Sequence, residues 1–281
     1  MPSSKSPTSA PVAEKSLPEY RRPPVNETAL SIQFAPLDNF GIPHYGLYWS
    51  KIRSEFGKYQ IHTPLPSITE QFGDAQVGQG VGFQLLLQPD VRSWFLDNSG
   101  TRLVQLQRDR FIHNWRQVKG DEEYPRYPAV KNTLVNEWKR FREFLTSEKL
   151  GPPQVNQCEV IYVNHLEYTD GWAGYGEFNK AIANWSRPTS GGFLPAPEKV
   201  NLEAHYVLPN QSGRLHISVL PVIRGRDLKE VLQISLTARG APKSSSDDDV
   251  FSWFDLGREW VVKGFTDFTT PDMHKLWGRS K

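Results

Sequence analysis

Residues 108–116, with the sequence RDRFIHNWR, combine aromatic and basic side chains in a pattern that could bind single-stranded nucleic acid. Such sites stack bases on aromatic rings and follow the phosphates with cations. Alternate side chains of an extended strand share a face, so the aromatic and most of the basic side chains would lie on opposite faces. The candidate nucleic-acid-binding residues are Arg110, Phe111, His113, Trp115 and Arg116.

The same segment has a simpler interpretation, in which Phe111 and Trp115 belong to the hydrophobic core and Arg110 and Arg116 are solvated. The formal net charge is only +2, from 33 Lys and Arg against 31 Asp and Glu. This near balance argues against nucleic acid, because nonspecific affinity for nucleic acid depends on an excess of positive charge. We favour the core interpretation and keep nucleic-acid binding as an alternative.

Histidines give no metal-binding pattern. None of the seven is followed by another at the i+2 spacing, or at the i+4 spacing of a helical metal site. His165, His205 and His216 lie on predicted strands and could converge across a sheet, but ordinary sheet or surface histidines are the more common case. The sequence therefore predicts no metal site and no cofactor.

Sequence motifs for a catalytic nucleophile or a phosphate-binding loop are likewise missing. A G-x-S-x-G elbow and a P-loop are both absent from the sequence. The single cysteine, Cys158, excludes an intrachain disulfide. It stands seven residues before His165 on one predicted strand, so their side chains would point to opposite faces. The glycine-rich residues 78–82 lead into a predicted strand, not a helix that could bind an anion. We predict no catalytic residue.

Trp277 is the candidate residue for partner binding, because it lies beyond the last predicted helical pattern and aromatic residues are enriched in interface cores. The alternative is a C-terminal tail that packs against its own domain.

Hydrophobic periodicity predicts the elements that position these residues. It predicts helices over 44–56, over 128–147 and from Ser246 onward, with a shorter helix around Phe178, Ile182 and Trp185. Ser246 is the predicted cap of the last helix. Residues 57–80 are ambiguous and partly loop. Period-two runs predict strands over 25–34, 82–88, 91–96, 101–107, 110–117, 157–166, 200–208, 214–223 and 231–238.

The predicted apolar faces of the two long helices would cover an antiparallel sheet. These faces are Val130, Leu134, Trp138, Phe141 and Leu145 in the first helix, and Val250, Phe254, Val261, Phe265 and Phe268 in the last. The predicted fold class is α+β, in two strand–helix–strands–helix halves with a duplicated layout. Residues 1–24 are a predicted disordered tail, with the alternative that residues 17–24 lie on the domain, and the halves span 25–150 and 151–281. The pattern leaves open whether they form one continuous sheet or two lobes.

Composition limits the class of protein. Hydrophobic residues make up 38% of the 281 residues, which is enough for a substantial core, and no apolar run is long enough to span a membrane. Residues 1–24 lack the apolar core of a secretory signal. With one free thiol, these features favour a cytoplasmic protein.

Five segments resemble a sporadically distributed bacterial protein family of unknown function. They are PPVNETALSIQFAPL at 23–37, LVQLQRDRFIHNWR at 103–116, YPAVKNTLVNEWKRF at 127–141, VIYVNHLE at 160–167 and HKLWG at 274–278. The resemblance covers roughly residues 20–278. It implies a bacterial cytoplasmic protein with the patchy inheritance of accessory genes, including those of mobile elements and defence. It supplies no catalytic residues.

From the residues and this resemblance we expect a binding or interaction protein without an evident catalytic site. Its protein partner or small ligand would lie on the sheet or in the groove between the halves, and a homodimer remains open. The alternatives are single-stranded nucleic-acid binding through the aromatic and basic strand, and a helix-grip-like cavity for a small molecule. The last alternative requires a pocket of roughly 300–1,000 Å³.

Overall fold

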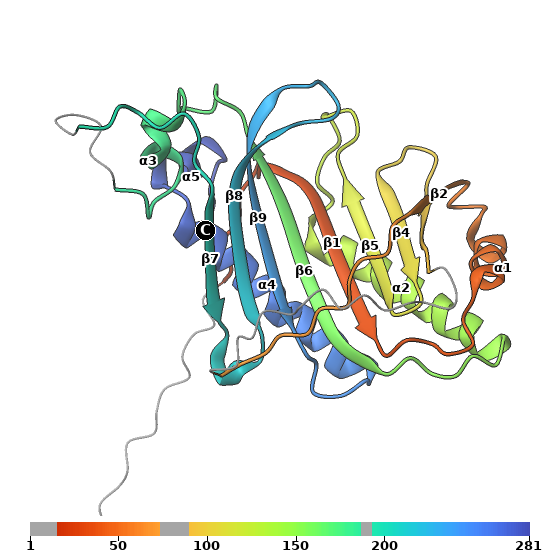
Figure 1. Cartoon of the computed structure of the whole chain (residues 1–281). Helices are drawn as coiled ribbons and strands as arrows, with labels where there is room; N and C mark the ends of the chain where they lie inside the picture. The colour runs from red at the N-terminus through yellow and green to blue at the C-terminus, as the bar shows by residue number, and fades with distance from the viewer. Residues whose placement is uncertain (1–15, 74–89, 187–192) are drawn as a thin grey trace, which may run out of the picture.

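A computed structural model describes residues 16–73, 90–186 and 193–281, and it contains one continuous antiparallel sheet (Figure 1). Within these ranges nine strands follow the order β2-β3-β4-β5-β1-β6-β9-β8-β7. The predicted α+β class is confirmed. The strands are β1 (Val25–Phe34), β2 (Lys58–His62), β3 (Arg92–Leu96), β4 (Arg102–Gln107), β5 (Arg110–Arg116), β6 (Val155–Leu166), β7 (Leu202–Val207), β8 (Arg214–Ile223) and β9 (Glu230–Gly240).

The two predicted halves meet at the centre of the sheet, where β1 pairs antiparallel with β6. In each half the first strand pairs with the last strand of the following meander, β1 with β5 and β6 with β9. The question left open by the sequence is therefore settled in favour of a single sheet. A duplication of the two halves stays a prediction.

The two longest helices of the protein cover one face of this sheet and are drawn behind the strands in Figure 1. The helices are α1 (Ile42–Ile52), α2 (Arg126–Ser147), α3 (Phe178–Ala181), α4 (Asp247–Phe268) and α5 (Pro271–Leu276), with 3₁₀ turns at Tyr175–Glu177 and Pro209–Gln211. Helix α2 packs on β5, and α4 packs on β6, β9 and β8. None of the described helices is long and apolar enough to cross a membrane.

The predicted apolar faces of α2 and α4 are confirmed, since every residue named for them is buried. The predicted cap is also confirmed, because the Ser246 hydroxyl accepts the Asp249 backbone N–H at 3.2 Å. Two glycines on α4 were not recognised as part of this face. A Cβ on Gly257 would lie 2.9 Å from a Val160 methyl, and one on Gly264 would lie 2.6 Å from a Leu215 methyl. Glycine at these positions lets α4 approach the sheet closely.

The second sheet face is crossed by residues 63–73, which we call the strap. In Figure 1 it is the orange segment that runs in front of the strands. The sequence pattern over this region is ambiguous, and it indicates neither β2 nor α5. The strap contains Pro64 and Pro66, which cannot donate backbone hydrogen bonds and so do not suit a central strand. The predicted strand at 82–88 lies outside the described residues.

A buried polar pair joins the sheet to α2. His113 of β5 and Glu137 of α2 lie 2.8 Å apart, from Nδ1 to Oε2, and each side chain is only 2% exposed. The second carboxylate oxygen of Glu137 has no hydrogen-bond partner within the described residues. Each member of the pair therefore depends on the other for its polar contact.

We expect His113→Leu to destabilise the protein by about 3–5 kcal/mol, because it leaves the Glu137 carboxyl buried and unpaired. The double variant His113→Leu/Glu137→Leu should recover most of this loss, since two packed apolar side chains need no polar partner. Urea unfolding of both variants measures the difference. As a control, Lys263→Ala removes an exposed pair with Glu259 and should change little. A double variant as unstable as the single one would contradict the prediction.

Candidate functional site

The aromatic residues of the predicted nucleic-acid site lie on the helix-covered face of β5. Phe111, His113 and Trp115 are 0%, 1% and 6% exposed. The Phe111 ring stacks on Phe141 with centroids 5.1 Å apart, and the Trp115 ring lies 5.3 Å from that of Tyr124. In this arrangement their rings offer no open surface on which a base could stack.

The two arginines of that site point to the opposite face, as the predicted alternation requires. Arg110 is 3% exposed and donates to the Pro66 carbonyl at 2.9 Å. Arg116 donates to the Gly100 carbonyl at 3.0 Å, and its guanidinium lies over the Trp94 ring. The structure thus divides the five candidates between two faces, and nucleic-acid binding by them stays a prediction.

Trp277 packs against its own chain. It is 4% exposed, and its ring lies 5.0 Å from Phe265 and 5.9 Å from Tyr20. This is the tucked-tail arrangement that the sequence analysis gave as the alternative, and partner binding through Trp277 stays a prediction.

The strand histidines do not converge on one point. His205 and His216 face each other across β7 and β8 with ring centroids 4.6 Å apart. On β9, however, His216 lies opposite Thr237 and His165 lies opposite Gln233, four positions away. In the described part of the chain no three His, Cys, Asp or Glu residues form a group that could hold a metal ion.

Cys158 is fully buried on the helix-covered face, and burial raises the pKa of its thiol well above the ordinary value. A neutral buried thiol packs as a small apolar side chain. The glycine-rich residues 78–82 lie outside the described residues.

A pocket of about 440 Å³ opens on the helix-covered face, between the start of α2 and the second half of α4. We call it the inter-helix pocket. Its floor is the centre of the sheet, and residues 18–23 pass along its rim. The lining includes Tyr20, Arg21, Val25, Tyr124, Arg126, Tyr127, Tyr162, Asn164, Leu236, Arg258, Val261, Val262 and Phe265. Its size falls in the range of small-molecule sites.

Of the three arginines that line this pocket, Arg258 is the one with a buried nitrogen that has no hydrogen-bond partner among the described residues. Its guanidinium lies over the Tyr127 ring, 4.9 Å from the centroid, and its buried Nε has no hydrogen-bond partner. No ion pair of Arg258 exists within the ranges that the structure describes. Arg126 differs, because its two terminal nitrogens donate to the carbonyls of Tyr20 and Arg21 at 2.8 and 2.9 Å.

Three tyrosines with hydrogen-bonded hydroxyls line the same pocket. The hydroxyls of Tyr124 and Tyr162 are 2.7 Å apart, and the Tyr127 hydroxyl donates to Asp255 at 2.9 Å. Burial raises the pKa of Tyr162 well above its ordinary value of 10.0 and raises that of Tyr124 too. These phenols therefore stay neutral at physiological pH and act as hydrogen-bonding groups.

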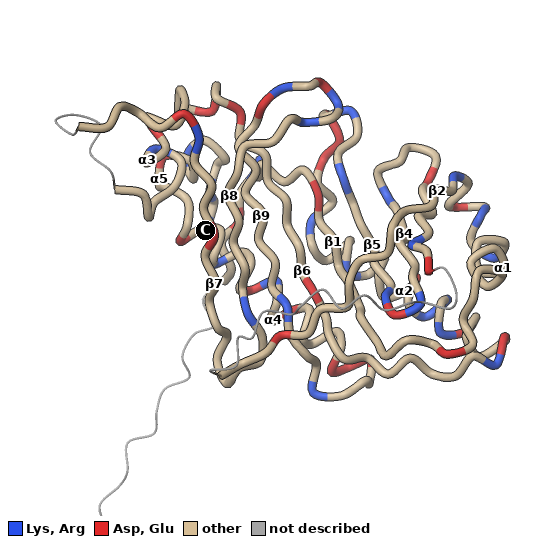
Figure 2. The backbone as a smooth tube through the Cα atoms, in the orientation of Figure 1, with Lys and Arg blue, Asp and Glu red and all other residues tan. Residues whose placement is uncertain are grey.

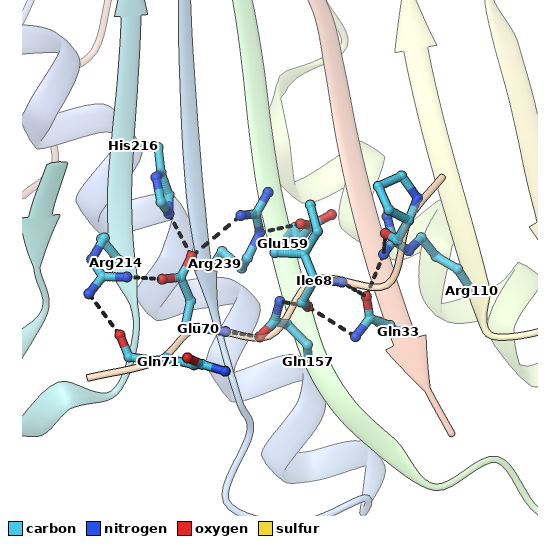
Figure 3. Close-up of polar contacts among 11 residues, drawn as sticks. Gln33, Ile68, Glu70, Gln71, Arg110, Gln157, Glu159, Arg214, His216 and Arg239 are labelled. Atoms are coloured by element: carbon cyan, nitrogen blue, oxygen red, sulfur yellow. Dashed lines mark hydrogen bonds and ion pairs between the residues drawn. The ribbon is translucent and has the colours of Figure 1, made fainter. Parts of the chain in front are cut away.

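The opposite face is polar where the strap crosses it, and three glutamines hold the strap's backbone. Figure 3 shows two of them, Gln33 and Gln157. Gln107 of β4 accepts from the Leu65 N–H and donates to its carbonyl, both at 3.0 Å. Gln33 of β1 does the same for Ile68, at 3.2 and 3.1 Å. Gln157 of β6 accepts from the Glu70 N–H at 3.1 Å and also donates to the Ile68 carbonyl. Polar positions of successive strands thus form one row across the sheet.

The far end of this row is a charged cluster around Glu70. Its carboxylate pairs with Arg214 and with His216 of β8, the latter at 2.6 Å, and with Arg239 of β9 at 3.4 Å. Arg239 also pairs with Glu159 of β6 at 2.5 Å. Figure 2 shows the acidic and basic positions side by side where the strap meets these strands.

The sequence alone indicates neither the inter-helix pocket nor the polar sheet face under the strap. The glutamines were visible only as polar members of alternating strands, and their common row depends on strand order. Arg258 lies on the helix predicted from Ser246 onward, where the hydrophobic pattern indicates only the apolar residues. No short motif marks either arrangement.

We expect attachment of the strap to weaken in acid. Burial alone would raise the pKa of Glu70, but the hydrogen bond from His216 and the charges of His216, Arg214 and Arg239 outweigh it and hold the pKa below its ordinary 4.5. A carboxyl whose pKa is lowered by docking stabilises the docked strap at a pH above its ordinary pKa of 4.5. This stabilisation is lost as the pH falls through the lowered pKa.

Hydrogen exchange measures this effect as the protection factors of the Ile68 and Glu70 amides, corrected for intrinsic rates, between pH 6 and pH 3. Protection should fall toward pH 3 in the wild-type chain, and most of that fall should be absent in Glu70→Gln. Equal protection at both ends of the range would contradict the prediction.

No protein-family model matches the chain, and a search of curated proteins finds no match.

Proposed function

We propose that this protein is a binding protein whose inter-helix pocket holds a small organic anion with an apolar body. The observation that carries the proposal is Arg258, a cation on the pocket wall with a buried, unpartnered Nε and no ion pair among the described residues. A buried polar group without a partner costs free energy, and an anionic ligand would supply the missing acceptor.

The other lining groups suggest the shape of the ligand. Val261, Val262 and Phe265 of α4 form an apolar wall, which suits an aromatic or aliphatic body. The hydroxyls of Tyr124 and Tyr162 can orient a carboxylate, sulfonate or phosphate group beside Arg258. Three arginines and one glutamate line the pocket, and the glutamate, Glu19, pairs with Lys281 at 3.2 Å. This charge balance favours an anion.

Binding is preferred to catalysis because the groups around the pocket are suited to recognition. Its phenols are neutral and buried, and an arginine side chain does not exchange its proton at physiological pH. A general acid or base requires a pKa near the operating pH. We also infer that the two halves are a duplicated unit, which is supported by their shared strand layout and would make the pocket the place where the two units meet.

The test compares wild-type protein with Arg258→Gln, using the fluorescent probe 8-anilinonaphthalene-1-sulfonate. The probe carries an anionic group on an apolar aromatic body. A charge-assisted hydrogen bond contributes about 1.5–3 kcal/mol, so the variant should bind the probe roughly 10- to 100-fold more weakly. Native mass spectrometry of gently purified wild-type protein should in addition detect a retained anion.

Two controls make this result interpretable. Arg142→Gln removes an exposed arginine that pairs with Asp247 on the protein surface, and it should bind the probe as tightly as the wild type. The neutral analogue N-phenyl-1-naphthylamine should bind the wild type and Arg258→Gln equally. Equal binding of the sulfonate probe to wild type and Arg258→Gln would refute the proposal.

A further inference from the structure

The strap is held on the polar sheet face in the way that a binding groove holds an extended peptide. The side-chain amides of Gln33, Gln107 and Gln157 form hydrogen bonds with its backbone, and Arg110 donates to its Pro66 carbonyl at 2.9 Å. Contacts of this kind do not depend on the side chains of the bound segment. The side-chain contacts gather at Glu70 and at Phe72, whose ring lies 5.0 Å below the Arg214 guanidinium.

The sheet residues beneath the strap are more deeply buried than the strap itself. Beneath the strap, Gln33, Gln107, Gln157 and Glu159 are each no more than 4% exposed. No residue of the strap itself is buried to that degree, and Ile68 and Glu70 are intermediate. The face therefore consists of polar groups that require a covering backbone, whereas the strap contributes no core side chain.

We propose that this polar face is a docking site for an extended acidic segment of a partner polypeptide, and that the strap is an exchangeable occupant within the chain. Charge complementarity selects the partner. Arg110, Arg214 and Arg239 face the strap together with the His216 imidazole, and Glu159 offsets only part of the positive charge of the three arginines. The partner would place a carboxylate where Glu70 lies and would bind across the strands.

Exchange is physically reasonable because, apart from the ion pairs of Glu70 and the hydrogen bonds from arginines, the strap is held by neutral hydrogen bonds that are individually weak. A hydrogen bond contributes little net stability after the loss of water, and ordering each residue of an extended segment has a comparable entropic cost. Segments with few buried apolar contacts open locally without unfolding of the whole protein. The sheet and its helix-covered core do not depend on apolar burial by the strap.

The primary experiment uses the full chain and a fluorescent peptide with the sequence of the strap, TPLPSITEQFG, as the probe. In Glu70→Ala the strap loses its anchor while the basic cluster stays intact. We expect this variant to bind the peptide at least tenfold more tightly than the wild type, measured by fluorescence anisotropy. A peptide with alanine in place of its glutamate should bind at least tenfold more weakly than the original.

A matched control, Glu203→Ala, removes an exposed glutamate of β7 outside the cluster and should bind the peptide like the wild type. If folded Glu70→Ala does not bind the peptide, or binds both peptides equally, the proposal is overturned.

A second measurement needs no variant and applies even if Glu70→Ala fails to fold. Excess unlabelled peptide should accelerate hydrogen exchange of the wild-type strap amides at Ile68 and Glu70, while the Leu30 amide in β1 is unchanged. If strap amides exchange only together with Leu30, the strap is a permanent part of the fold and the proposal fails. This result is independent of the inter-helix pocket, which lies on the other face.

Discussion

The antiparallel pairing of β1 with β6 is the interaction on which the rest of the structure depends. It joins a five-stranded half to a four-stranded half, and its register places Leu30 opposite Val160 on the helix-covered face. The neighbouring pair, Ala29 and Ile161, faces the other way. Because side chains alternate along a strand, this one register decides which face of both halves is apolar and which is polar.

The inter-helix pocket follows from this pairing. Helix α2 packs over β5 and helix α4 over β6, β9 and β8, so the start of α2 and the second half of α4 stand on either side of the sheet's centre. Gly257 and Gly264 determine how closely α4 packs on the sheet beside the pocket. The pocket therefore combines side chains from both halves, including Tyr124 from one and Tyr162 from the other.

The polar face of the sheet differs from the helix-covered face, because its glutamines and charged groups are buried and need hydrogen-bond partners. The strap satisfies them through its backbone and through Glu70. The glutamine amides need only the backbone of the covering segment, but a segment without an acidic side chain at this place would leave Arg214 and His216 without their carboxylate partner. The two sites lie on opposite faces of the sheet. The inter-helix pocket shares side chains such as Val261 and Phe265 with the hydrophobic core, whereas the polar face does not.

The sequence by itself determined the α+β class, the two long helices and most strands, because those elements depend on local periodicity and on caps such as Ser246. It also predicted that Phe111 and Arg110 point to opposite faces. Strand order, the row formed by Gln107, Gln33 and Gln157, and the position of Arg258 over the pocket were decided only by the tertiary structure. These features join residues far apart in the chain, and no local pattern encodes which distant strands become neighbours.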